Sequence, residues 1–107
     1  MEAAEISQDE FVVAHESGTG VVDVRSPEEY AAGHVPGAVN VPLDKVEVRT
    51  AELTADPAVH VICQAGGRSM KAAEMLAARG VRVLSVAGGT KAWIESGRPV
   101  VTGSHPR

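Results

Sequence analysis

Cys63 is the only cysteine in this chain of 107 residues, and a short glycine-rich segment, Gln64-Ala65-Gly66-Gly67-Arg68, follows it. The apolar run 59–62 predicts a buried strand, and residues 69–79, rich in Ala, Met and Lys, predict a helix. Backbone N–H groups of a loop that turns into a helix N-terminus point at a common centre and stabilise an anion. We therefore expect a reactive Cys63 thiolate, whose pKa is lowered by the helix dipole and by the Arg68 cation.

A lone cysteine at the end of an apolar strand can also be a small buried hydrophobe without a chemical role. The residues after it favour the reactive interpretation, because Gly66 and Gly67 let the backbone turn tightly, including at positive φ. Open α/β sheets bind their ligands at the carboxyl ends of the strands, which is where Cys63 is expected to lie.

Strand and helix patterns alternate along the chain. A capping box, Ser7 with Glu10, predicts a first helix that Gly18 ends, and Ser26-Pro27 predicts the start of a second. The expected strands are residues 5–6, 21–24, 38–41, 59–62 and 81–86, and the later helices are residues 43–53 (capped by Asp44), 69–79 and 90–96. Asp56-Pro57 predicts a break in the chain. The alternation predicts an α/β fold, a parallel sheet with helices on both faces.

Length and composition are those of a single globular domain, with a core over about residues 5–101 and a flexible tail at 102–107. The net charge of −4, without a basic stripe, argues against nucleic acid as a partner. The sequence has no apolar stretch of about eighteen residues, which argues against a membrane partner. A single cysteine and an acidic N-terminus favour the cytoplasm.

Four stretches of the sequence resemble the rhodanese family of sulfurtransferases, and they occur in the family's order. They are Asp23-Val24-Arg25 with Glu29-Tyr30, Gly33-His34-Val35-Pro36-Gly37-Ala38 with Asn40, Cys63 to Ser69, and Gly88-Gly89 with Ala92-Trp93 and Gly97. The resemblance covers about residues 5–101. It implies a rhodanese-like three-layer fold, in which a five-stranded, mostly parallel sheet carries helices on both faces.

The same resemblance implies a two-step transfer of sulfane sulfur. Cys63 would attack the outer sulfur of thiosulfate or of a persulfide donor, and cyanide, another thiol or a partner protein would then take the sulfur. The residues implied in substrate binding are Gln64, Ala65, Gly66, Gly67, Arg68 and Ser69, and those implied in positioning the loop are Asp23 and Arg25. We expect no cofactor and no metal, since the four histidines and one cysteine lack metal-ligand spacing.

Loop length separates this function from its nearest rivals. Four residues lie between Cys63 and Arg68, one fewer than in related phosphatases and arsenate reductases, which bind a tetrahedral oxyanion. The Gly-Val-Thr ending of mercaptopyruvate-using relatives is missing. An alternative is a sulfur-carrier or docking module that relays a persulfide to a partner protein without turnover. A catalytically inactive interaction domain is disfavoured, because the cysteine and the glycines are present.

The charged residues near the loop admit more than one pairing. We expect Arg25 to pair with Glu29 as a structural contact. Arg68 either supports anions at the sulfur or turns away to pair with Asp23 or Glu29 and holds the loop from outside. For His34, a packing or hydrogen-bonding role is favoured over a general base, because persulfide chemistry needs no base.

Overall fold

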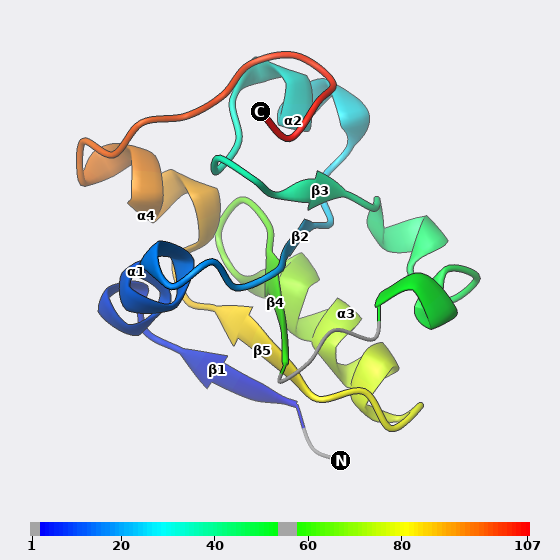
Figure 1. Cartoon of the computed structure of the whole chain (residues 1–107). Helices are drawn as coiled ribbons and strands as arrows, with labels where there is room; N and C mark the ends of the chain where they lie inside the picture. Colours follow the sequence, from blue (N-terminus) through cyan, green and yellow to red (C-terminus); the bar gives the residue numbers. More distant parts are fainter. Residues whose placement is uncertain (1–2, 54–57) are drawn as a thin grey trace.

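A five-stranded parallel sheet forms the centre of the molecule (Figure 1). The computed structural model describes residues 3–53 and 58–107. The strands are β1 (Ala4–Ile6), β2 (Val21–Asp23), β3 (Val39–Asn40), β4 (Val59–Ile62) and β5 (Val83–Val86). Their order across the sheet is β1-β5-β4-β2-β3, and every pairing is parallel. The predicted fold class is confirmed, and β4, which leads to Cys63, lies at the centre.

Four α-helices in the described part of the chain cover the two faces of the sheet (Figure 1). They are α1 (Gln8–Glu16), α2 (Pro27–Ala32), α3 (Gly67–Ala77) and α4 (Gly89–Glu95). Alternation along β4 turns Val59 and Val61, together with Cys63, into the core beneath α3. Ile62 faces the opposite core, which α1, α2 and α4 supply with Phe11, Tyr30 and Trp93. Cys63 therefore belongs to the layer between the sheet and α3.

The two predicted helix starts are confirmed in atomic detail. The Ser7 hydroxyl accepts from the Glu10 N–H while the Glu10 carboxylate accepts from the Ser7 N–H, and Ser26 and Glu29 repeat this capping box at α2. Pro27 occupies the first helical position of α2. Each capping box joins two residues that are three positions apart, so it forms locally and does not depend on the packing of the rest of the chain.

The predicted helix over residues 43–53 is wrong. Two short 3-10 helices, Leu43–Lys45 and Thr50–Leu53, stand there, and Asp44 lies inside the first of them instead of capping a helix. Val46 is fully buried at the turn between them. The Thr50 hydroxyl donates to backbone carbonyls one turn earlier, which competes with regular helix formation, as β-branched residues also do.

Several element boundaries differ from the prediction by one or two residues, and two of them bear on the site. Helix α3 begins at Gly67 and not at Ser69, so Arg68 belongs to the first helical turn. Strand β5 begins at Val83 and not at Val81. The break predicted at Asp56-Pro57 lies outside the described residues.

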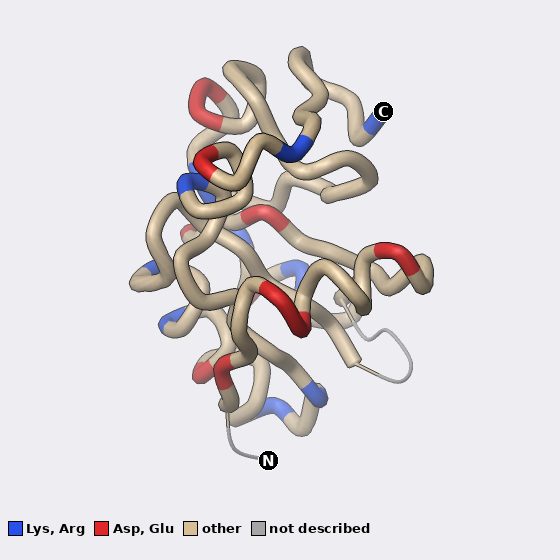
Figure 2. The backbone as a smooth tube through the Cα atoms, turned by 90° about the vertical axis from the view of Figure 1, so that its left-hand side faces the viewer, with Lys and Arg blue, Asp and Glu red and all other residues tan. Residues whose placement is uncertain are grey.

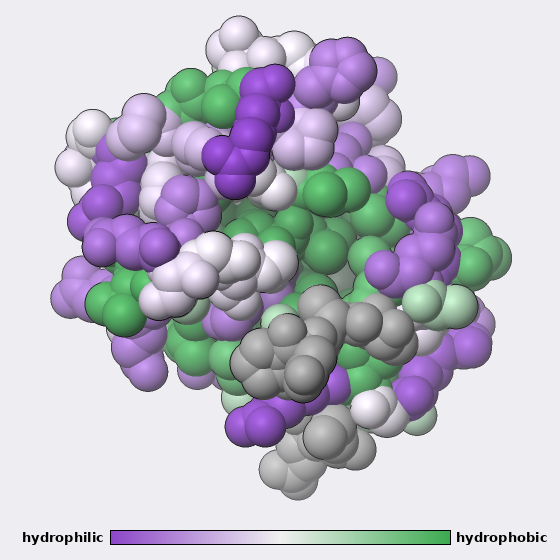
Figure 3. Space-filling view, viewed as in Figure 1, coloured by the Kyte–Doolittle hydropathy of each residue, from purple (hydrophilic) through white to green (hydrophobic). Residues whose placement is uncertain are grey.

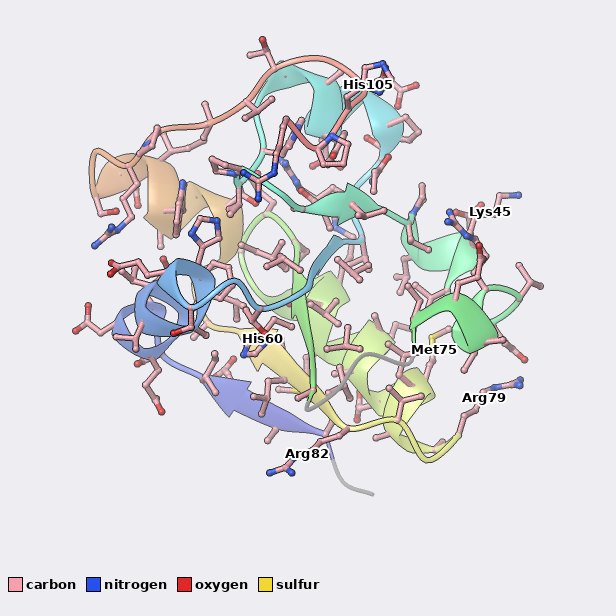
Figure 4. All side chains as sticks on the ribbon, viewed as in Figure 1. Lys45, His60, Met75, Arg79, Arg82 and His105 are labelled. Atoms are coloured by element: carbon pink, nitrogen blue, oxygen red, sulfur yellow. The ribbon has the colours of Figure 1, made fainter. Side chains whose placement is uncertain are left out.

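The C-terminal segment contains no helix or strand, but hydrogen bonds attach it to the region around α2. Val101 pairs with His34 as an antiparallel bridge. Beyond it, the Gly103 N–H donates to Ala31 O (2.8 Å) and Pro106 O accepts from Gly37 N–H (2.9 Å). Figure 4 shows His105 beside α2. The segment predicted as a flexible tail is thus held along much of its length.

Charged residues are spread over the surface. On the side shown in Figure 2, Lys and Arg positions of the described chain are interspersed with Asp and Glu positions and form no continuous basic stripe. Among the helices of the described residues, none has the length and apolarity needed to cross a membrane.

Candidate active site in the Cys63 loop

Cys63 lies directly after β4 and is 1% exposed. The N-terminus of α4 holds the loop from one side, because the Thr90 N–H donates to Cys63 O (2.8 Å) and the Lys91 N–H to Gln64 O (3.0 Å). A Cβ atom at Gly89 would lie 2.5 Å from Cys63 O, so only glycine permits this approach. The loop is therefore fixed between the starts of α3 and α4.

The Cys63 sulfur is surrounded by hydrogen-bonding groups of the loop. The Gly66 N–H donates to Sγ at 3.0 Å, and the Ser69 hydroxyl lies 3.4 Å from Sγ. Burial raises the pKa of Cys63, but the Ser69 hydroxyl and the N–H groups of Ser69, Gly66 and Ala65 together lower it below its ordinary value. We call these four groups the thiolate cradle.

The turn that forms this cradle depends on one glycine in particular. Gly66 has φ of 117°, in the left-handed region, and is the residue before the first turn of α3. Gly67 is already helical, and a Cβ atom added to it would meet nothing within 4 Å. The two glycines, treated alike at the level of the sequence, therefore have different structural demands.

Arg68 pairs with Glu29 and not with the sulfur. Its guanidinium donates to both carboxylate oxygens, Nη1 to Oε1 at 2.7 Å and Nη2 to Oε2 at 2.9 Å. The Arg68 hydrogen bonds are the main cause that lowers the pKa of Glu29 to about 2. Of the two arrangements open to Arg68, the structure has the outward pairing, and the main causes that lower the pKa of Cys63 are hydroxyl and N–H groups.

The expected pair between Arg25 and Glu29 is wrong, because Arg25 pairs with Asp23. Arg25 Nη2 lies 2.8 Å from Asp23 Oδ2 and Nε lies 3.0 Å from Oδ1, with both side chains buried. A buried carboxylate at the end of β2 is costly without a partner, and the side chain two residues later supplies one. Arg25 also donates to Gln64 Oε1 (3.3 Å) and to Gly33 O (2.8 Å), so the pair touches the Cys63 loop.

Two cavities are lined in part by residues of the Cys63 loop. The larger, about 640 Å³, we call the Leu43 groove, and it is lined by Val24, Ser26, Pro27, Pro42, Leu43, Asp44, Arg68, Lys71 and Met75. The other, about 420 Å³, contains Arg25, Glu29 and Gln64 in its wall. Of the ion pair, Arg68 lines the first cavity and Glu29 the second. A third hollow, the apolar one beside β3 in Figure 3, includes no residue from 63 to 69.

His34 lies outside both cavities beside the loop. Its ring stacks on Tyr30 at 3.6 Å between centroids and is fully buried. Its nitrogens contact Tyr30 O (2.7 Å) and His105 O (2.8 Å). These contacts are of the packing and hydrogen-bonding kind favoured for this residue.

The structure brings most of the predicted site residues together and adds others. Cys63, Gly66 and Ser69 meet at the sulfur, and Gln64 adjoins them through its contact with the buried pair of Asp23 and Arg25. Sequence reasoning missed Ser85, whose hydroxyl lies 2.8 Å from that of Ser69. It also missed the contact of Gly89 with the loop. The one available signal for Ser85 was a hydroxyl residue inside the apolar run of β5.

Comparison with known proteins agrees with this geometry. The sequence matches the Rhodanese-like domain family over residues 4–96. A sulfurtransferase of Allochromatium vinosum is 38% identical over 82 residues, which cover 76% of this chain and 77% of that protein. The thiosulfate sulfurtransferase PspE of Escherichia coli is 43% identical over 72 residues, which cover 65% of this chain and 69% of that protein.

A solved structure extends the similarity to the whole fold. The rhodanese-related protein from Thermoplasma volcanium superimposes with a TM-score of 0.84 and 32% identity, covering 94% of this chain and 99% of that one. The match of the family over most of the chain, the similar structure and the cysteine loop at the carboxyl end of the central strand agree with one another. This chain belongs to the family of rhodanese-like domains.

Proposed function

We propose that this chain is a sulfurtransferase that carries sulfane sulfur as a persulfide on Cys63. The donor is thiosulfate or a persulfide, and the acceptor is a thiol, cyanide or a partner protein. The observation that carries this proposal is the thiolate cradle, in which Gly66 N–H and the Ser69 hydroxyl stand 3.0 and 3.4 Å from Sγ. The fixed Gly66 N–H stabilises a sulfur anion without reorganising, and the Ser69 hydroxyl has only to rotate to donate to it.

In the first step, the Cys63 thiolate attacks the outer sulfur of the donor. A bond forms between Sγ and that sulfur while the sulfur–sulfur bond of thiosulfate breaks, and its electron pair leaves on sulfite. In the second step, a thiolate or cyanide attacks the terminal sulfur of the persulfide, and the electron pair returns to Sγ. Charge balances in both steps, and no proton has to be moved by a base.

The pairing of Arg68 bears on the donor. Glu29 already neutralises the guanidinium, so a dianion such as thiosulfate meets less positive charge at the loop than a free arginine would offer. Lys71, one turn further along α3, is exposed and lines the Leu43 groove. A singly charged persulfide donor suits this balance better than thiosulfate. A reducing compartment such as the cytoplasm would keep Cys63 available as a thiol.

Mass measurement of the intact protein tests the proposal directly. After incubation with thiosulfate or with a small-molecule persulfide, we expect one added sulfur atom, which cyanide or excess thiol removes. Cys63→Ser should take up none. An equal adduct in Cys63→Ser would overturn the proposal, as would the absence of any adduct with both donors.

Kinetics then separate an enzyme from a carrier. Repeated turnover of donor and cyanide supports an enzyme, whereas a single uptake of sulfur, released only to a protein acceptor, supports the carrier module. Hydrolysis of an aryl phosphate by the wild-type protein, absent in Cys63→Ser, would contradict both.

A further inference from the structure

Ser85 places a hydroxyl inside the apolar layer between the sheet and α3. Val83, two residues earlier on the same face of β5, belongs to the apolar core beneath α3, and the strand ends one residue after Ser85. The side chain is 0% exposed. A hydroxyl buried in this way costs free energy unless it forms a hydrogen bond. Its partner in the described part of the chain is Ser69, whose Oγ lies 2.8 Å away.

The donors and acceptors around Ser69 determine how this pair is arranged. Ser69 has a single hydroxyl hydrogen, and Gly66 O, which only accepts, lies 3.1 Å from its oxygen. While Cys63 is a thiol, its S–H donates to Ser69 Oγ and the Ser69 hydrogen goes to Gly66 O. Ser69 Oγ is then an acceptor toward Ser85, so the hydroxyl of Ser85 is the donor.

Ionisation of Cys63 changes the role of Ser69 but not that of Ser85. The thiolate has no hydrogen to donate, so the Ser69 hydroxyl turns toward Sγ and donates to it. Ser69 Oγ still accepts from Ser85. A hydroxyl that accepts one hydrogen bond becomes a stronger donor of the next, most of all in a site shielded from water.

We propose that Ser85 is a positioning residue for Cys63 that acts through Ser69, because its buried hydroxyl donates to Ser69 Oγ and strengthens the bond from Ser69 to the sulfur anion. Its importance for sulfur transfer rests on the proposed function, whereas its effect on the thiol does not. The opposing view is that the two serines merely fasten β5 to α3.

Replacing Ser85 with alanine leaves the charged groups near the Cys63 loop unchanged. They are Asp23 on β2, Arg25 after β2, Glu29 on α2, Arg68 and Lys71 on α3, and Lys91 on α4. Asp23 is paired with Arg25, and Glu29 with Arg68. Since the hydroxyl of Ser85 contacts none of them in the described structure, Ser85→Ala removes one neutral donor and leaves these charges in place.

A double-mutant cycle on the pH profile of alkylation decides between the two views. The rate of Cys63 with uncharged iodoacetamide is measured against pH for wild type, Ser69→Ala, Ser85→Ala and the double variant. In Ser85→Ala we expect about a threefold lower rate below the titration midpoint and convergence with wild type at high pH. Ser69→Ala should lose at least as much, and the double variant should match Ser69→Ala.

Two further variants serve as controls. Ser85→Thr keeps the hydroxyl and should restore the wild-type midpoint. Thr19→Val removes a half-buried hydroxyl that contacts His60 Nδ1 at 3.0 Å (His60 is labelled in Figure 4), before the start of β2, and should leave the midpoint unchanged. Thermal unfolding of each variant shows that it is folded.

An unchanged midpoint in Ser85→Ala would overturn the proposal. So would a further fall in the double variant, because Ser85 would then act on the sulfur independently of Ser69. Alkylation needs no sulfur donor, so a failure here is distinguishable from a failure of persulfide formation.

Discussion

The guanidinium of Arg68 binds the carboxylate of Glu29 through two hydrogen bonds of 2.7 and 2.9 Å, which join the first turn of α3 to α2. The cation of the Cys63 loop is therefore neutralised within the protein. It acts between two helices, and the sulfur anion is stabilised by neutral donors. These separate roles lead to predictions that differ from those for an unpaired arginine beside the thiolate.

Removing the cation should change stability more than thiol reactivity. In Arg68→Ala we expect unfolding to require about 0.5–1 kcal/mol less, because both side chains of the pair are more than a third exposed and water screens them. The pH midpoint for alkylation of Cys63 should stay close to that of wild type. Urea unfolding and alkylation rates measure the two quantities. A large rise of the midpoint would show that Arg68 supports the anion directly.

The same pair predicts how stability depends on acid. The pKa of Glu29 is lowered from 4.5 to about 2 in the folded protein, so its contribution is present above the unfolded pKa. As pH falls from about 4.5 toward 2, the unfolded chain binds the proton first and this stability is lost. Unfolding followed at pH 6 and pH 3 should show a smaller acid loss in Glu29→Gln, which keeps a side chain able to complete the capping box with Ser26. Equal acid losses would contradict the prediction.

The two glycines of the loop should respond in opposite ways to alanine. Gly66→Ala places a Cβ on a residue with φ of 117°, and we expect destabilisation of about 1–3 kcal/mol and slower persulfide formation. Gly67→Ala places it in open space on a helix and should stabilise the protein by about 0.5–1 kcal/mol. Thermal unfolding and mass measurement compare the pair. If Gly67→Ala proved the more damaging change, the loop would not have this backbone.

Deletion of residues 102–107 should lower stability without altering the thiol. The segment supplies His105 O to the buried His34 ring, Pro106 O to Gly37 N–H and the N–H of Gly103 to Ala31 O. Water replaces these partners only in part, so we expect a loss of about 1 kcal/mol. Differential scanning calorimetry gives the stability, and the alkylation profile of Cys63 serves as the internal control. An unchanged melting temperature would mean that the segment detaches in solution.

The strands, the helix starts and the position of Cys63 were predictable because local signals specify them. The apolar run 59–62 marks β4, and Ser7 and Ser26 each begin a helix through partners three residues away. The ion pairs were not predictable, because Arg25 and Arg68 each had two carboxylates within reach. Only the packing of α2 on the sheet decides that Asp23 takes one and Glu29 the other.

The remaining misses concern the segment 43–53 and Ser85. The segment 43–53 contains good helix formers, yet burial of Val46 and the hydroxyl of Thr50 favour tight turns there. Ser85 resembles any serine in a strand until α3 brings Ser69 against it. A long-range contact of this kind leaves no periodic pattern in the sequence.

The groups that hold the thiolate cradle in place come from parts of the chain that meet only when the sheet is complete. The cradle itself lies within residues 65–69, but Ser85, which contacts Ser69, comes from β5, and Gly89 belongs to the start of α4, which holds Cys63 O. Contacts at such separations form after the local elements, as the slow part of folding. A nascent or partly unfolded chain therefore carries an ordinary, sluggish thiol, and acidity of the cysteine emerges with the native state. The acidity of the Cys63 thiol therefore indicates whether the chain has folded completely.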